Sequence, residues 1–192
     1  MTSNEFWLWL NNNLFCAGMN LEYHQTMAWR FWVAECAANM AVMILVIASI
    51  AIAARKTLAR WSIPVSVVSA IVAAGLLVVP FASWRVQSER CAGEWSSIKG
   101  TLSGLEQDYH RIAKDKPISD SVQNEVRALE ARKGQLQASE PAAWPKLLKE
   151  CYGNQVERMH GPGIRTAEEA RKNLEARGAV LDQPQRPAPA AG

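Results

Sequence analysis

The run from Cys36 to Ala54 constrains the fold of this chain most, because Asn39 is its only strongly polar residue. Its nineteen residues, at a rise of about 1.5 Å each, span close to the roughly 30 Å hydrocarbon core of a bilayer. A second run, from Ile63 to Ala82, has twenty residues without a charge, and the connector between the two runs is short and basic. The pattern predicts two membrane-spanning helices joined as a hairpin.

Tryptophans mark the ends of both runs, where an indole ring can keep its body among acyl chains and its N–H among headgroups. They are Trp29, Trp32, Trp61 and Trp84. A soluble core helix can be equally apolar, but two such runs, each flanked by tryptophan and arginine, favour lipid. We therefore expect an all-α chain with a transmembrane hairpin over residues 30–84, whose spans are 31–54 and 63–82.

The charges divide the chain. Residues 1–84 hold four basic and three acidic residues, whereas residues 85–181 hold sixteen basic and fourteen acidic ones. The second part is predicted to be a soluble helical domain. Because its charges alternate in sign and form no basic patch, direct binding of nucleic acid is not expected. Residues 182–192 are rich in proline and alanine and are predicted to be disordered.

The N-terminal segment, residues 1–29, has no basic residue and only a short apolar cluster at its start, so it does not resemble a cleavable signal peptide. Its apolar side chains can lie in the headgroup layer as an interfacial helix, or can pack on a neighbouring subunit. The sequence leaves both open. These side chains are Phe6, Trp7, Leu8, Trp9, Leu10, Leu14 and Phe15.

After the second run, apolar residues recur at alternating spacings of three and four, which is the heptad pattern of a helix that buries one stripe against a partner. They are Cys91, Trp95, Ile98, Leu102, Leu105, Tyr109 and Ile112. We call these residues the seam. Pro117 predicts a break, and a second helix to about Ala138 is expected to fold back on the first. The seam then joins this helical hairpin or neighbouring subunits.

Two shorter helices are expected beyond the break at Pro141 and Pro145. The first should end at the sequence HGPG. Thr166 and Glu169 have the spacing of a capping box, which predicts the start of the last helix.

Catalytic and metal-binding patterns are not found in the sequence. The three histidines stand far apart, no residue cluster has metal-ligand spacing, and no glycine-rich phosphate loop occurs. We expect neither an enzyme nor a cofactor or metal site. Cys91 and Cys151 can be buried thiols in a reducing compartment or a bridged pair in an oxidising one.

Glu35 and Asn39 are one helical turn apart at the start of the first span, so they share a face. One interpretation is that Glu35 reaches the interface beside Arg30 while Asn39 bonds to a neighbouring helix. The other is that both line a water-filled path in an oligomer. On the second span a strip of small residues at four-residue spacing suits close helix packing. The strip comprises Ser62, Ser66, Ala70 and Ala74.

The order of these parts resembles the SLATT group of bacterial two-transmembrane effectors. The likeness covers about residues 21 to 160 and is carried by "YHQTMAWRFW", the two runs, "WRVQSERCAGEWSSIKGTLSGLEQDY" and "EPAAWPKLLKECYGNQVE". It implies an oligomeric protein of the bacterial inner membrane that permeabilises the membrane when a partner, such as a nucleotide-signal sensor encoded nearby, reports phage infection. It also implies that both termini and the soluble domain are cytoplasmic.

We therefore expect a homo-oligomeric, multi-pass inner-membrane effector whose partners are the lipid bilayer, other copies of itself and a sensor. The alternative is a membrane-anchored scaffold with an outward helical domain. The basic residues do not decide the orientation, because the connector carries Arg55, Lys56 and Arg60 while the outer flanks carry four basic residues.

Overall fold

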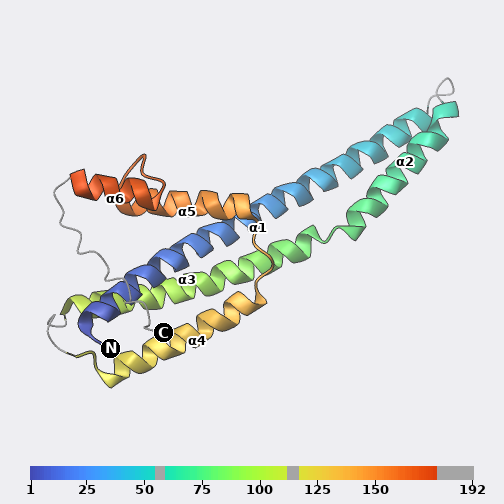
Figure 1. Ribbon diagram of the computed structural model, residues 1–192. Coiled ribbons are helices and arrows are strands. Elements are labelled where there is room, and N and C mark those ends of the chain that lie inside the picture. Colours follow the sequence, from blue (N-terminus) through green and yellow to red (C-terminus); the bar gives the residue numbers. More distant parts are fainter. Residues whose placement is uncertain (55–58, 112–116, 177–192) are drawn as a thin grey trace, which may run out of the picture. The chain divides into compact units, whose positions relative to one another are not determined.

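The computed structural model describes residues 1–54, 59–111 and 117–176 (Figure 1). Within these ranges every regular element is a helix, so the all-α prediction is confirmed. The helices are α1 (Ser3–Ala53), α2 (Ala59–Val78), α3 (Phe81–Arg111), α4 (Asp120–Ser139), α5 (Pro145–His160) and α6 (Ala167–Ala176). The chain divides into two compact units, Met1–Ala142 and Ala143–Gly192.

Helix α1 is one uninterrupted helix of 51 residues, about 75 Å long. It begins with a capping box, in which Thr2 accepts a bond from the backbone of Glu5 and the Glu5 carboxylate accepts one from the backbone of Thr2. We expected residues 1–29 to form a segment apart from the first apolar run. They form the first half of the same helix, because no proline lies within α1 and a single glycine is not enough to end it.

The first half of α1 packs with α3 and α4 around one apolar core (Figure 1). The seam residues from Cys91 to Leu105 are buried in this core. Phe6 and Leu10 reach it from α1, and Val126, Leu129 and Leu136 reach it from α4. The seam is therefore covered by its own chain. The side chain of Tyr109 and all of Ile112 lie outside the described residues.

Helix α2 packs along the second half of α1 (Figure 1). The Ser49 and Ser69 hydroxyls lie 3.2 Å apart across this contact, where either can donate to the other, and each also lies 2.8 Å from a carbonyl one turn earlier on its own helix. The partly buried positions repeat at spacings of three and four on both helices. They include Val42, Leu45, Ser49 and Ile52 on α1, and Val65, Ser69 and Val72 on α2.

The second apolar run does not continue as one helix to Ala82. Helix α2 ends at Val78 and α3 begins at Phe81. Pro80 lies between them and has no backbone N–H to continue α2. Its carbonyl instead accepts from the backbone of Trp84 and from the hydroxyl of Ser83, so it begins the next helix.

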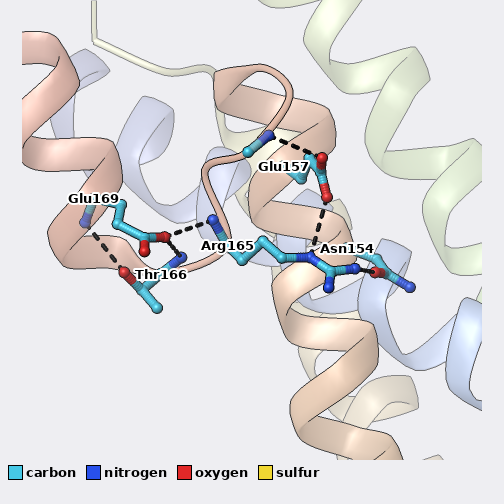
Figure 2. A network of polar contacts seen from close by, with 6 residues as sticks. Asn154, Glu157, Arg165, Thr166 and Glu169 are labelled. Atoms are coloured by element: carbon cyan, nitrogen blue, oxygen red, sulfur yellow. Dashed lines mark hydrogen bonds and ion pairs between the residues drawn. The ribbon is translucent and has the colours of Figure 1, made fainter.

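In the second unit a loop held by side-chain hydrogen bonds joins α5 to α6 (Figure 2). Arg165 donates to Glu157 at 3.1 Å and to Asn154 at 2.6 Å. The predicted capping box is confirmed, because Thr166 accepts from the backbone of Glu169 and the Glu169 carboxylate accepts from the backbone of Thr166 (Figure 2). The loop also contains Gly161 and Gly163 at positive φ, a backbone region that favours glycine. The predicted tail, residues 182–192, lies outside the described residues.

Candidate functional site: the membrane boundary

The outward surface of α1 and α2 is apolar and uncovered. Among the described residues, one helix, Ser3–Ile52, is long and apolar enough to cross a membrane by length and composition, and none of its most apolar 18-residue window is buried. Ile63–Gly75 of α2 is a shorter apolar stretch. The exposed large side chains are Met40, Met43, Ile44, Val46, Ile47, Ile50, Ile63, Val67, Val68 and Ile71. This surface ends toward the bundle in a band of aromatic and charged residues, which we call the boundary; it comprises Trp29, Trp32, Trp84, Glu35 and Arg85.

Aromatic rings surround the boundary. Trp29, Trp32 and Trp84 are all exposed. The ring of Trp84 lies 5.5 Å from that of Phe31 on α1 and meets that of Phe81 edge to face at 6.1 Å. The contact between Phe31 and Trp84 adds to the packing of α1 on α3. The side chain of Trp61 lies outside the described residues.

Glu35 pairs with Arg85 across α1 and α3. Glu35 Oε2 lies 3.6 Å from Arg85 Nε, which is longer than a hydrogen bond, and Glu89 lies 4.0 Å from the same nitrogen. Both side chains of the first pair are partly buried. Neither interpretation of Glu35 foresaw this partner. The pair connects the start of the first apolar run with the residues that follow the second apolar run.

Asn39, one turn beyond Glu35, is exposed among the apolar side chains of α1. It therefore does not pack against α2 within the chain.

The predicted packing strip on α2 does not face α1. Ser66, Ala70 and Ala74 are exposed, and the side chain of Ser62 lies outside the described residues. The face toward α1 is offset and carries Ser69. Four-residue spacing drifts around a helix of 3.6 residues per turn, whereas the contact with α1 follows alternating spacings of three and four. The strip therefore stays a prediction for contact with another helix.

A buried polar node lies on the bundle side of the boundary. His24 Nε2 lies 3.0 Å from Glu140 Oε1, and the Trp95 indole N–H donates to the same oxygen. Burial by itself raises the pKa of Glu140, but the bonds from His24 and Trp95 outweigh it and lower the pKa below the ordinary value. His24 is buried, and its Nδ1 has no hydrogen-bond partner among the described residues. The node joins α1, α3 and the end of α4.

A second indole–carboxylate contact lies farther along the bundle. Trp9 donates to Glu130 at 2.7 Å, and Lys133 donates to both Glu130 at 2.9 Å and Asn13 at 2.7 Å. Burial raises the pKa of Glu130, whereas the bonds from Lys133 and Trp9 lower it, and the net change is downward. Helix α4 is thus held to α1 and α3 by one tryptophan from each.

A cavity of about 220 Å³ opens at the boundary. It is lined by Met27, Phe31, Trp84, Gln87, Ser88, Pro141 and Ala142. We call it the boundary cavity. A larger hollow of about 380 Å³ lies between α3 and α4 and is lined mainly by polar side chains, among them Arg90, Glu94 and Arg132. Arg132 and Glu94 already pair there at 2.6 Å.

Metal-ligating side chains do not gather in the part of the chain that the structure describes. No group of three His, Cys, Asp or Glu side chains is placed to hold a metal ion among the described residues. Cys91 and Cys151 are buried free thiols in different units. Burial, with Glu140 nearby, raises the pKa of Cys91, which disfavours its reactive thiolate.

Comparison with protein-family models, with curated proteins and with solved structures finds no match to this chain. The likeness to the SLATT effectors therefore stays a prediction.

Sequence reasoning missed Arg85, Ser49, Ser69 and the Glu140 node. Arg85 had a signal, because it directly follows Trp84 at a predicted membrane end. Ser49 and Ser69 had a weaker signal, since they are polar residues within two apolar runs. His24 and Glu140 are 116 residues apart, and no local pattern connects them.

Proposed function

We propose that this chain is a multi-pass membrane protein in which the second half of α1 and α2 form a two-span hairpin, and that copies of it associate to permeabilise the membrane. The observation that carries the proposal is that the two halves of α1 have different surroundings within the chain. Its first half is covered by α3 and α4, whereas its second half leaves that cover and exposes large apolar side chains. Lipid is the phase in which such a surface is stable.

The length of the hairpin supports this proposal. Helix α2 has 20 residues, about 30 Å, and α1 extends a similar distance from Glu35 to Ala53. The exposed rings of Trp29, Trp32 and Trp84 then lie at the headgroup level. Since the first half of α1 and α3 belong to one bundle, both enter the hairpin from the same side of the membrane.

Exposed polar groups on the hairpin support association between copies. Asn39 and Ser66 are exposed on an otherwise apolar surface, where lipid offers no hydrogen-bond partner. A second copy can supply partners, and the small side chains of Ala70 and Ala74 beside Ser66 permit close approach. In this arrangement Asn39, rather than the paired Glu35, keeps water in a passage between copies.

The resemblance to the SLATT effectors supplies the proposed setting. The chain would act in the bacterial inner membrane with its soluble bundle in the cytoplasm, as an anti-phage effector triggered by a sensor encoded nearby. The three-helix bundle is the part that such a sensor can contact.

The test compares purified protein in vesicles of phosphatidylethanolamine and phosphatidylglycerol. Asn39→Leu should reduce both chemical cross-linking between copies and release of an entrapped dye. The substitution removes the amide that can hydrogen-bond to a second copy and to water in the passage. Met40→Leu, at the neighbouring exposed position, is the matched control and should behave as the parent. Equal release and cross-linking by the parent and Asn39→Leu would contradict the proposed role of Asn39.

A second candidate function is a membrane-anchored scaffold. The Glu35–Arg85 pair favours it, because a neutralised pair at the boundary fixes the hairpin to the bundle and offers no charged ring to ions. If the chain is a scaffold, the parent protein should insert stably into the same vesicles without releasing the dye. Depolarisation of cells that express the parent chain, at matched membrane levels, would favour the effector.

A further inference from the structure

Of the two hollows described above in the first unit, the boundary cavity has the more apolar lining. Met27 and Phe31 lie one turn apart on α1, and Trp84 and Ser88 lie one turn apart on α3. Pro141 and Ala142, which follow α4, complete the wall. Among its lining residues Gln87 and Ser88 are the polar ones, and none of the seven carries a charge.

The size of the cavity limits what it can hold. Pockets for whole small molecules measure roughly 300 to 1,000 Å³, whereas this cavity measures about 220 Å³. A chain of several methylenes fits such a space, and each methylene that is buried contributes about 0.8 kcal/mol in transfer from water. The absence of a charge among the lining residues argues against a phosphate or carboxylate as the buried part.

The position of the cavity identifies the source of an apolar occupant. On the bundle side, the cavity adjoins the node of His24, Trp95 and Glu140. Two residues that line the cavity follow residues of the node, since Met27 lies one turn after His24 and Pro141 directly follows Glu140. On the other side, the exposed Trp84 lines the cavity and also belongs to the group of aromatic residues at the boundary. The cavity therefore lies where the uncovered apolar surface of the hairpin begins.

The wall formed by Pro141 and Ala142 is fixed at one end. Glu140, directly before Pro141, accepts the bond from Trp95 and lies against buried His24. This attachment holds the start of the segment across α1 and α3, so the cavity has a defined shape without an occupant. A cavity preorganised in this way loses less free energy on binding than one that must first close.

We propose that the boundary cavity binds the part of a phospholipid acyl chain nearest its headgroup, with exposed Gln87 at the rim and buried Ser88 in the wall. The site rests on the proposed insertion of the hairpin, because only then does the cavity adjoin lipid. It makes the boundary a lipid-binding site rather than a passive end of two spans.

The experiment uses the full chain in vesicles of phosphatidylethanolamine and phosphatidylglycerol that contain a phosphatidylcholine with a diazirine on one acyl chain, near the glycerol in one preparation and at mid-chain in another. After photolysis, mass spectrometry measures lipid adducts on two regions: residues 27–31 with 84–88, and the hairpin surface at residues 40–50. The second region reports insertion. Gln87→Phe and Ala142→Phe each add a ring at the cavity, and Gln107→Phe adds the same ring at an exposed position elsewhere on α3.

We expect adducts in both regions of the parent. Gln87→Phe and Ala142→Phe should lower the boundary adducts about tenfold, as the loss of two buried methylenes implies, while hairpin adducts and helical content stay unchanged. Gln107→Phe should match the parent. Two results would overturn the lipid site alone, provided that hairpin adducts are normal. One is the absence of boundary adducts from the parent, and the other is their persistence in both cavity variants. Absence of hairpin adducts from the parent would overturn the proposed insertion and the site with it.

Discussion

The two halves of α1 differ both in apolar content and in what covers them. In the first half, Phe6 and Leu10 are covered by α3 and α4, and the polar atoms of Trp9 and Asn13 bond to Glu130 and Lys133. In the second half, large apolar side chains are exposed, and the hydroxyls of Ser49 and Ser69 meet in the contact with α2. The difference teaches that one continuous helix can be covered by its own chain in one half and present an uncovered apolar surface in the other. Under the proposed insertion, the polar bonds to neighbouring helices mark the half that stays in water.

The largest expected effect lies within the first half. Leu10 is 0% exposed and Leu8 is 63% exposed, two residues apart on the same helix. Leu10→Ala should lower the free energy of unfolding by about 2–5 kcal/mol, because it leaves a cavity in the core. Leu8→Ala should change it by no more than about 0.5 kcal/mol. Urea unfolding in mild detergent, followed by circular dichroism, compares the two, and equal losses would show that the bundle does not cover Leu10.

The next effect concerns pH. The folded state lowers the pKa of Glu140, so its contribution to stability is present above the pKa of the unfolded state, near 4.5, and is lost as pH falls through the lower folded value. Glu140→Gln should cost about 1–3 kcal/mol at pH 7 and progressively less in acid. The measurement is the urea midpoint from pH 7 to pH 3. A cost that does not decrease in acid would exclude the ionised carboxylate as the stabilising group.

A smaller effect is expected from the ion pair at the boundary. Glu35→Gln keeps the size of the side chain and removes its charge, and a partly exposed pair at 3.6 Å contributes up to about 1 kcal/mol. The loss should shrink in high salt because the pair is open to solvent at one side. Glu89→Gln is the matched control, since Glu89 is farther from the same nitrogen and more exposed. A larger loss for Glu89 than for Glu35 would reverse the assignment of the main partner.

The smallest effect belongs to the second half of α1. Ser49→Ala should destabilise the contact with α2 by about 0.6 kcal/mol, which is typical of hydrogen bonds between helices in membranes. Ser66→Ala removes a hydroxyl that does not face α1 and should leave the contact unchanged. Unfolding in mixed detergent micelles compares them, and a double variant at Ser49 and Ser69 should cost little more than either alone, because the two hydroxyls share one bond.

Sequence alone predicted the helices well where a period was regular. The seam gave α3 and its buried face, and the pairing of Thr166 with Glu169 gave the start of α6. It did not predict that α1 is continuous, because the polar run Asn11–Asn13 separates two apolar stretches without actually breaking a helix. The candidate site was predicted only in part, since Glu35 and the tryptophans lie at the boundary, but the partners Arg85 and Glu140 come from distant segments that only the packing brings together.

The most direct test of the account compares Leu8 with Ile47, which are 63% and 62% exposed on the same helix. Each is replaced by a spin-labelled cysteine in a chain whose four native cysteines are changed to serine or alanine, and the protein is placed in bilayers. Collision with oxygen, which concentrates in lipid, and with a water-soluble nickel chelate is then measured for each label. We expect the label at position 8 to collide with the chelate, and the label at position 47 to collide with oxygen but not with the chelate. Access of the chelate to position 47 would contradict a membrane-inserted hairpin.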